Sequence, residues 1–274
     1  MHSYKQLVTW ALAEDIGSGD ISAQLILPVT QGQAFIIARE PAVVCGIEYV
    51  NEVFKQVDAT IAVTWLVTEG QYQKEAGQWA IIDGPLHAIL TAERTALNFL
   101  QTLSAVATKT KTYVDLLDGS NTKLLDTRKT IPGLRLAEKY AVRCGGGYNH
   151  RLGLYDEFLI KENHIAALGS VSQAIKAAIN LHAEKPIVVE VQTIAEFLEA
   201  KKFPIQRIML DNFNDSMIAQ ALHLNLNPRH QIEVSGGIDQ HRLKKLVALG
   251  VDYISIGALT KSISAIDFSL LVNG

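Results

Sequence analysis

The sequence predicts an α/β protein whose second half forms a parallel array of alternating strands and helices. Two observations carry this prediction. After residue 120, short apolar runs recur and end near residues 161, 190, 211, 235 and 257, with helix-like stretches between them. Before residue 120, strand-like and helical segments are mixed without this alternation. Because a crossover helix returns the chain to the same edge of a sheet, regular alternation indicates parallel strands.

The composition is that of a folded protein with one large or two unequal domains. The chain has 274 residues, of which 48% are hydrophobic and 19% are charged, and this balance excludes a disordered chain. Lys and Arg number 25 against 28 Asp and Glu, so the net charge is −3. No overall positive field is present to hold DNA or RNA, and we expect no nucleic-acid partner.

The amino terminus predicts a cytoplasmic protein without a membrane anchor. Residues 1–5 lack the charged-then-apolar layout of a secretory signal, and Glu14, Asp15 and Asp20 argue against an organelle transit peptide. No apolar run approaches the roughly 18 residues that span a bilayer.

The two cysteines predict neither a metal site nor a disulfide framework. Cys45 and Cys144 lie 99 positions apart and form no C-x-x-C pair, which disfavours a zinc site, a redox pair and a secreted disulfide scaffold. Since a buried free thiol behaves as a small hydrophobic side chain, we expect packing or bystander residues.

The first hundred residues predict a mixed α+β region. Apolar residues between Leu7 and Leu12 recur at helical spacing, between a candidate cap at Ser3 and the glycines at 17 and 19, which indicates a short amphipathic helix. Runs rich in Val, Ile and Ala, separated by Gly, Pro and charged residues, then indicate strands at residues 34–38, 61–67 and 79–82.

A longer helix is predicted from Thr91 onward for about five turns. Its apolar stripe consists of Ala92, Ala96, Phe99, Leu100, Leu103, Val106 and Ala107. The opposite face carries Arg94, Asn98, Gln101 and Thr108. This polar face is either solvated or in contact with another subunit.

The array after residue 120 predicts an incomplete β/α barrel. Strands are expected at residues 123–126, 158–161, 187–190, 208–211, 232–235 and 253–257, and helices at 171–181, 195–201 and 241–249. The chain lacks G-x-G-x-x-G and the P-loop pattern that would favour an open nucleotide-binding sheet. Charged residues at several strand ends fit a barrel, but about 150 residues are few for eight β/α units.

Residues at these strand ends predict a cationic pocket with two acids. Arg128 and Lys129 follow the first strand, Lys161 the second, Glu190 the third and Asp211 the fourth, while His150 and Arg151 precede the second strand and Arg94 lies in the long helix. Clustered cations are costly to desolvate unless a polyanion fills the cavity. The two carboxylates suit either a hard cation such as Mg²⁺ or a developing positive centre on the substrate.

Other features leave alternatives open. Ser235, Gly236, Gly237 and Gly257 end later strands without bulky side chains, which leaves backbone N–H groups free to bind phosphate. Residues 145–147 are three glycines that form either a flexible loop or a phosphate cradle. Taken singly, Lys161 fits a surface ion pair and His150 a structural histidine, and Asp126 is interpreted as a structural carboxylate that orients the turn after it.

These segments closely resemble the quinolinate phosphoribosyltransferase family. The resemblance covers essentially the whole chain and is carried by LAEDIGSGD at 12–20, ERTALN at 93–98, LDTRKTIPGLR at 125–135, EKYAV at 138–142, GGGYNHRLGL at 145–154, LIKENH at 159–164, MLDN at 209–212, SGG at 235–237 and GALT at 257–260. One departure is Gln192, where the family often has a second acid. Because this alternate position is expected to point to the other side of the strand turn, we expect the departure to leave the chemistry unchanged.

The resemblance implies an amino-terminal α/β sandwich domain at residues 1–110, joined by the tail 262–274, and a β/α barrel domain at 111–261. It implies a homodimer in which Arg94 reaches the partner's active site. Catalytic roles would fall to Lys129, Lys161, Glu190 and Asp211, with Mg²⁺ held through substrate pyrophosphate and these two acids. The implied substrate-binding residues are Arg94, Thr127, Arg128, Lys129, His150, Arg151, Lys161, Glu190, Asp211, Ser235, Gly236, Gly237, Ile256, Gly257 and Ala258.

The implied reaction joins quinolinate to phosphoribosyl pyrophosphate and yields nicotinate mononucleotide, pyrophosphate and CO₂. Within the family, the alternatives are a molybdenum-uptake-associated homologue and a transferase that uses nicotinate without decarboxylation. Outside it, the alternatives are a Schiff-base aldolase using Lys161 and a non-enzymatic module that binds phosphorylated metabolites. Retention of Glu190 and Asp211 argues against the binding module, because pure anion binding would be stronger without them.

Overall fold

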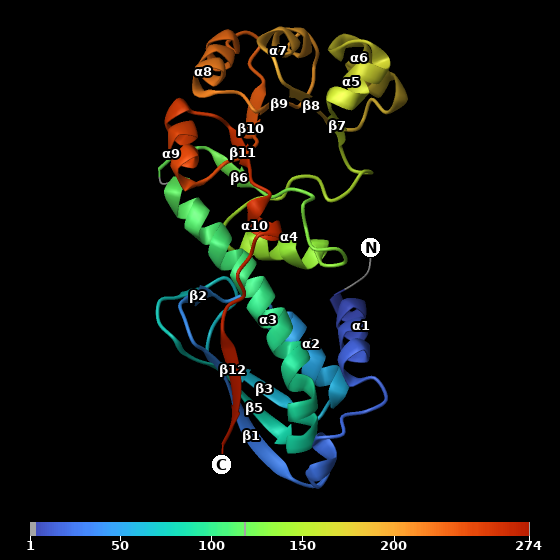
Figure 1. Ribbon diagram of the computed structural model, residues 1–274, viewed down its shortest axis with the longest axis vertical. Coiled ribbons are helices and arrows are strands. Elements are labelled where there is room, and N and C mark those ends of the chain that lie inside the picture. Colours follow the sequence, from blue (N-terminus) through green and yellow to red (C-terminus); the bar gives the residue numbers. More distant parts are fainter. Residues whose placement is uncertain (1–3, 118, 274) are drawn as a thin grey trace. The chain divides into compact units, whose positions relative to one another are not determined.

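The computed structural model describes residues 4–117 and 119–273, which fall into two compact units. The first unit comprises Met1–Lys111, Ile131–Gly146 and Ser262–Gly274, and the second comprises Thr112–Thr130 and Gly147–Lys261. The domain limits suggested by the sequence stay a prediction. The mixed α/β fold class is confirmed, and each unit has its own sheet (Figure 1).

The first unit contains a four-stranded antiparallel sheet. Its strand order is β12 (Phe268–Val272), β1 (Gln31–Ala38), β5 (Gly77–Pro85) and β3 (Ala62–Trp65). Alternate residues of β1, namely Ala34, Ile36 and Ala38, are buried, as expected for a sheet with one face against the core. The strands predicted near residues 34, 61 and 79 are therefore confirmed. Two short strands, β2 (Ala42–Val43) and β4 (Tyr72–Gln73), form a separate pair.

Helices of the first unit are α1 (Tyr4–Ile16), α2 (Ile47–Val57), α4 (Arg135–Cys144) and all but the last three residues of α3 (Leu86–Val114), with a short 3₁₀ turn at Ala23–Leu25. The predicted helix before Gly17 is confirmed as α1, and its candidate cap, Ser3, lies outside the described residues. The helix predicted from Thr91 is α3, which begins earlier, at Leu86. All seven residues of its apolar stripe are buried.

The polar face of α3 is not uniform. Arg94 and Asn98 are exposed, whereas Gln101 and Thr108 are half-buried. The Thr108 hydroxyl accepts a hydrogen bond from the Val43 N–H at 2.8 Å. The Thr108 hydroxyl therefore contacts β2, and of these four residues Arg94 and Asn98 are the exposed ones.

The second unit contains six parallel strands in the order β6 (Lys123–Leu125), β11 (Tyr253–Ser255), β10 (Gln231–Ser235), β9 (Arg207–Asp211), β8 (Ile187–Val191) and β7 (Phe158–Ile160). All six predicted strands are confirmed. In the part of the chain that the structure describes, β6 and β7 are edge strands of an open sheet, consistent with an incomplete barrel.

The helices that connect β7 to β8, β8 to β9, β9 to β10 and β10 to β11 lie on the outer side of the sheet (Figure 1). They are α5 (Glu162–Leu168), α6 (Val171–Leu181), α7 (Ile194–Ala200), α8 (Asp215–Leu224) and α9 (Gln240–Leu249). A 3₁₀ turn at Asp115–Leu117 precedes β6, and α10 (Ala258–Lys261) follows β11. The carboxyl ends of the strands are thereby brought to a common edge. Over residues 4–117 and 119–273, no helix is both long enough and apolar enough to cross a bilayer.

Candidate active site

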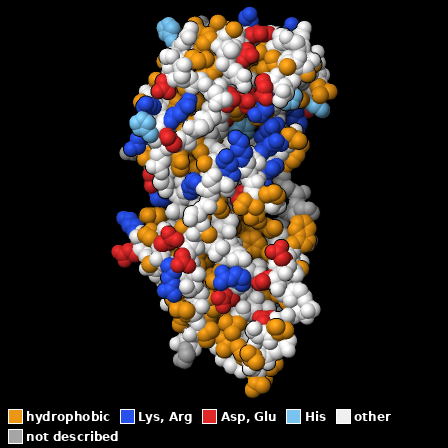
Figure 2. All heavy atoms as spheres, viewed as in Figure 1, with side chains coloured by type: hydrophobic (Ala, Val, Ile, Leu, Met, Phe, Trp, Pro, Cys, Tyr) orange, Lys and Arg blue, Asp and Glu red, His pale blue; other side chains and the backbone are white. Residues whose placement is uncertain are grey.

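A cavity of about 490 Å³ lies at the carboxyl ends of the parallel strands. It is lined by Thr127, Arg128, Lys129, His150, Arg151, Lys161, Glu190, Asp211, Ser235 and Gly236, all of which the sequence had marked as candidates. Leu159, Met209, Asn212 and Ser255 also line it and were not anticipated. Figure 2 shows Lys and Arg side chains gathered beside acidic ones on the face of the second unit in view.

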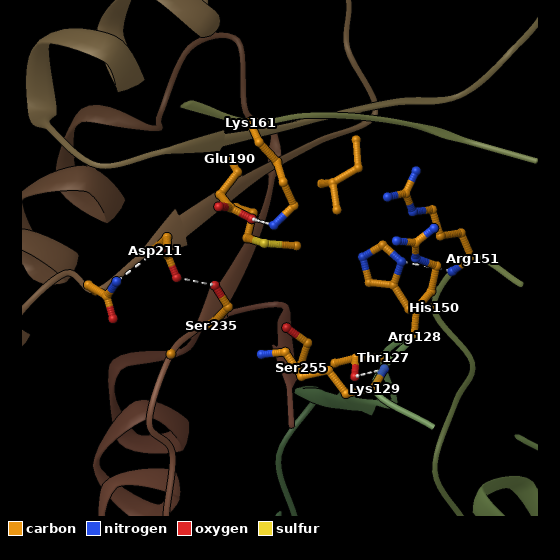
Figure 3. Close-up of a pocket in the computed structure, with 14 residues that line it drawn as sticks. Thr127, Arg128, Lys129, His150, Arg151, Lys161, Glu190, Asp211, Ser235 and Ser255 are labelled. Carbon is orange, nitrogen blue, oxygen red and sulfur yellow. Dashed lines mark hydrogen bonds and ion pairs between the residues drawn. The ribbon is translucent and has the colours of Figure 1, made fainter. Parts of the chain in front are cut away.

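The acidic side of the cavity is built by the ends of β8 and β9. Lys161 Nζ lies 2.7 Å from Glu190 Oε2, and the Glu190 side chain is only 8% exposed. Asp211 accepts hydrogen bonds from the Ser235 hydroxyl at 3.0 Å and the Asn212 amide at 2.9 Å. Both carboxylates are held in place before any substrate arrives, as Figure 3 shows.

A tight turn brings β10 against this acidic side. Gly236 has a φ of +92°, and a Cβ at this position would lie 2.6 Å from Asn212 Oδ1. Only glycine adopts this positive φ without strain and also leaves room for the Asn212 side chain. Because Gly236 has no side chain, the backbone of the Ser235–Gly236 turn faces the cavity directly.

The opposite side of the cavity carries Arg128, His150 and Arg151 (Figure 3). The Arg151 N–H donates to His150 Nδ1 at 2.7 Å, so this nitrogen carries no proton in that bond. The same nitrogen lies 3.4 Å from Glu157 Oε1. Nε2 is then the protonated nitrogen, 3.5 Å from Glu233 Oε2.

Positive charge is crowded on this side. Burial lowers the pKa of the Arg151 guanidinium, and the neighbouring charge of Arg128 lowers it further. Like charges in a cavity disfavour one another. An anionic ligand bound between Arg128 and Arg151 would relieve this repulsion.

Asp126 organises the loop that presents these residues. It is fully buried, and its two oxygens accept the His150 N–H at 2.9 Å and the Asn149 amide at 2.5 Å. The Asp126 N–H in turn donates to the Tyr148 carbonyl at 3.0 Å. The structural interpretation of Asp126 agrees with these bonds, although it holds residues 148–150 rather than only its own turn.

Beneath the cavity lies an ionic network that the sequence analysis missed. Arg207 Nη1 lies 3.0 Å from Glu233 Oε2, and Arg207 Nη2 lies 3.5 Å from Glu157 Oε2. Burial raises the pKa of the Glu157 carboxyl. A usable signal was present, because Glu233 stands between Ile232 and Val234 inside an apolar strand, where a charge requires a partner.

Several candidates do not line the cavity. Gly237, Ile256, Gly257 and Ala258 are absent from its wall, although a Cβ on Gly257 would lie 2.8 Å from Lys129 Cδ. Arg94 is an exposed residue of α3 in the first unit. The roles assigned to these residues stay predictions.

Two family models together match most of the chain. Residues 20–104 match the N-terminal domain of quinolinate phosphoribosyl transferase, and residues 106–271 match its C-terminal domain.

Individual relatives agree with the two models. A probable nicotinate-nucleotide pyrophosphorylase [carboxylating] of Bacillus subtilis is 39% identical over 268 residues, covering 97% of this chain and 92% of the relative. Quinolinate phosphoribosyltransferase [decarboxylating] 1b of Nicotiana tabacum is 36% identical, covering 99% of this chain and 83% of the relative. The solved structure of the nicotinate-nucleotide pyrophosphorylase from Francisella tularensis is 46% identical, with a TM-score of 0.95 over 98% of this chain and 96% of that one. The chain therefore belongs to the quinolinate phosphoribosyltransferase family.

Proposed function

We propose that the cavity of the second unit joins quinolinate to phosphoribosyl pyrophosphate and releases pyrophosphate and CO₂, leaving nicotinate mononucleotide. The observation that carries this proposal is the charge of the wall, where Arg128, Lys129, Arg151 and Lys161 outnumber the two carboxylates. Such a surplus matches two acidic substrates.

None of the relatives described above points to the molybdenum-uptake alternative. We also propose a cytoplasmic location for this enzyme.

Quinolinate is assigned to the side formed by Arg128, His150 and Arg151. Guanidinium groups bind carboxylates through two parallel N–H bonds, each charged hydrogen bond contributing roughly 1.5 to 3 kcal/mol. Figure 3 shows this side opposite Glu190 and Asp211. The two ring carboxylates are therefore kept away from the acids that would repel them.

Phosphoribosyl pyrophosphate is assigned to the side formed by Lys129, Lys161, Glu190 and Asp211. Lys161 pairs with Glu190 at 2.7 Å, and an arriving pyrophosphate would compete for its ammonium group. Lys129 and Lys161 then neutralise the leaving group, while Glu190 and Asp211 face the ribose carbon as it becomes positive. The Ser235–Gly236 turn, with Gly257, offers backbone N–H groups to phosphate oxygens.

The oxygen donors on this side fit Mg²⁺. Asp211 and Glu190 supply carboxylate oxygens, and Asp211 is oriented by Ser235 and Asn212, as ligands of a hard cation commonly are. These two residues would hold the ion together with substrate pyrophosphate, and the ion would offset negative charge on the leaving group.

No protein nucleophile is required. As the pyrophosphate bond to the ribose carbon breaks, the pyridine nitrogen forms a bond to that carbon and becomes positively charged. The electron pair of the neighbouring carbon–carboxylate bond can then stay on the ring carbon as CO₂ departs, and that carbon takes up a proton from solvent to give the C–H bond of nicotinate mononucleotide. The wall residues need only orient the ring and exclude water, so decarboxylation follows ribosyl transfer.

We further propose a homodimer in which Arg94 completes the partner's cavity. The exposure of Arg94 on α3 supports this proposal, because an arginine facing away from the apolar stripe is free to contact another chain.

The reaction is tested with quinolinate, phosphoribosyl pyrophosphate and Mg²⁺ by measuring CO₂ and nicotinate mononucleotide. We expect equal amounts of both products, loss of both in Lys161→Met, and wild-type rates in Lys176→Met, which removes an exposed lysine of α6. Activity on nicotinate alone, or unchanged turnover in Lys161→Met, would contradict the proposal.

A further inference from the structure

Both cysteines of the chain meet in the first unit, next to a carboxylate that the proposed reaction does not use. The Sγ atoms of Cys45 and Cys144 and a carboxylate oxygen of Glu69 all lie within 4.8 Å of one another. Cys45 is fully buried, whereas Glu69 and Cys144 are half-buried. The fold thus brings together two thiols that the sequence, by their separation of 99 positions, had treated as unrelated.

Glu69 is held rigidly at this cluster. Its Oε1 accepts hydrogen bonds from the Gly46 N–H and the Tyr140 hydroxyl, each at 2.8 Å. Its Oε2 accepts the Ile47 N–H at 3.1 Å. Carboxylates that bind metal ions are usually oriented by hydrogen bonds of this kind. Those of Glu69 are already formed without an ion.

We propose that Cys45, Glu69 and Cys144 form a binding site for a thiophilic divalent cation of the Zn²⁺ type. The donor set of two sulfurs and one oxygen is one that zinc accepts. The proposal does not depend on the reaction proposed for the second unit.

The geometry suits a tetrahedral ion. With metal–sulfur distances of about 2.3 Å and metal–oxygen distances of about 2.0 Å, tetrahedral ligand atoms lie roughly 3.5 to 4 Å apart. Since the three atoms already lie within 4.8 Å of one another, small side-chain rotations close the site. Glu69 and Cys144 are half-buried, which leaves an entry path and a fourth position for water.

Charge and proton balance are also consistent with an ion. Binding would break both S–H bonds, form two metal–sulfur bonds and release two protons to the buffer. Two thiolates and one carboxylate around a divalent ion leave a single negative charge, which lies beside Arg143 and the amino terminus of α2.

The test is a titration of the fully reduced, full-length protein with Co²⁺ under anaerobic conditions, followed by Zn²⁺ competition. We expect one Co²⁺ per chain, a thiolate-to-cobalt charge-transfer band, and displacement by Zn²⁺. Cys144→Ser should remove the band and weaken binding roughly 100-fold or more, and Tyr140→Phe should weaken it roughly 10-fold, since outer-shell losses fall in that range. His182→Ala, which removes an exposed histidine beside Glu184, is the matched control for surface binding and should bind as wild type.

Circular dichroism establishes that each variant is folded. Because Cys144 is half-buried, Cys144→Ser keeps the test decisive if the buried Cys45→Ser variant does not fold. The proposal is overturned if no charge-transfer band appears, if the band survives in Cys144→Ser, or if the two thiols form a disulfide and bind no cation after full reduction.

Discussion

Glu138 links the protonation of one side chain to the stability of the first unit. It is fully buried in α4, and its Oε2 accepts the Ile131 N–H at 3.0 Å. Burial raises its pKa from 4.5 to about 7. Between these two values the folded state keeps the proton that the unfolded chain has lost. The stabilising contribution is therefore complete below pH 4.5 and is lost as the pH rises through about 7.

Glu138→Gln should remove this pH dependence, because the amide does not ionise. From pH 4.5 to pH 7.5 the wild type should lose roughly 3 kcal/mol of unfolding free energy relative to the variant. Denaturant unfolding at a series of pH values measures the difference. Parallel curves for the two proteins would show that Glu138 does not titrate in this range.

Some site residues could be predicted from the sequence and others could not. Lys161, Glu190 and Asp211 could be assigned to one site because each lies at a strand end, and parallel strands bring such ends together. The pair Arg207 and Glu233 could not be assigned. It depends on the register of β9 and β10, in which Gln231 lies opposite Arg207, and no local pattern encodes that register.

At the scale of elements, the end of α4 depends on a glycine that packs against α3. Gly145 has a φ of −78°, which any residue can adopt. A Cβ there would collide with the carbonyl oxygen of Ala107 and lie 2.6 Å from Thr110 Cβ. Close packing, and not backbone conformation, therefore requires glycine at this position.

Gly145→Ala should destabilise the protein by about 2 kcal/mol or more, because helix backbone cannot move aside cheaply. Gly77→Ala is the matched control, since a Cβ at Gly77 meets nothing within 4 Å and should leave stability unchanged or raise it by up to about 1 kcal/mol. Chemical denaturation measures both variants. Equal midpoints for the two would refute the packing argument.

Whether the sequence predicts a helix depends on where the group that caps its first turn lies in the chain. For α6, the predicted bounds of 171–181 are those of the structure, because Ser170 caps it locally by accepting the Gln173 N–H at 3.1 Å. For α2, the cap comes from Glu69, more than twenty residues away in the chain. A helix whose first N–H groups are satisfied from a distant turn carries no local start signal.

At the scale of the whole molecule, a shared active site predicts complementation. Arg94→Ala and Lys161→Ala should each abolish turnover as pure proteins. After subunit exchange, hybrid dimers would contain one intact site, so a 1:1 mixture should recover about a quarter of wild-type activity by two-fold symmetry. Steady-state rates of the mixture before and after subunit exchange measure the recovered activity. If hybrids verified by differential tags stay inactive, Arg94 does not act on the partner's cavity.

The central claim is that guanidinium groups of the cavity bind the acidic substrate, and the dissociation constant of quinolinate measured by titration calorimetry tests it most directly. Arg151→Ala should weaken binding about 10- to 150-fold, the equivalent of roughly 1.5 to 3 kcal/mol, whereas Arg143→Ala, at an exposed position of α4, should bind as the wild type does. Equal dissociation constants for the wild type and Arg151→Ala would contradict the account.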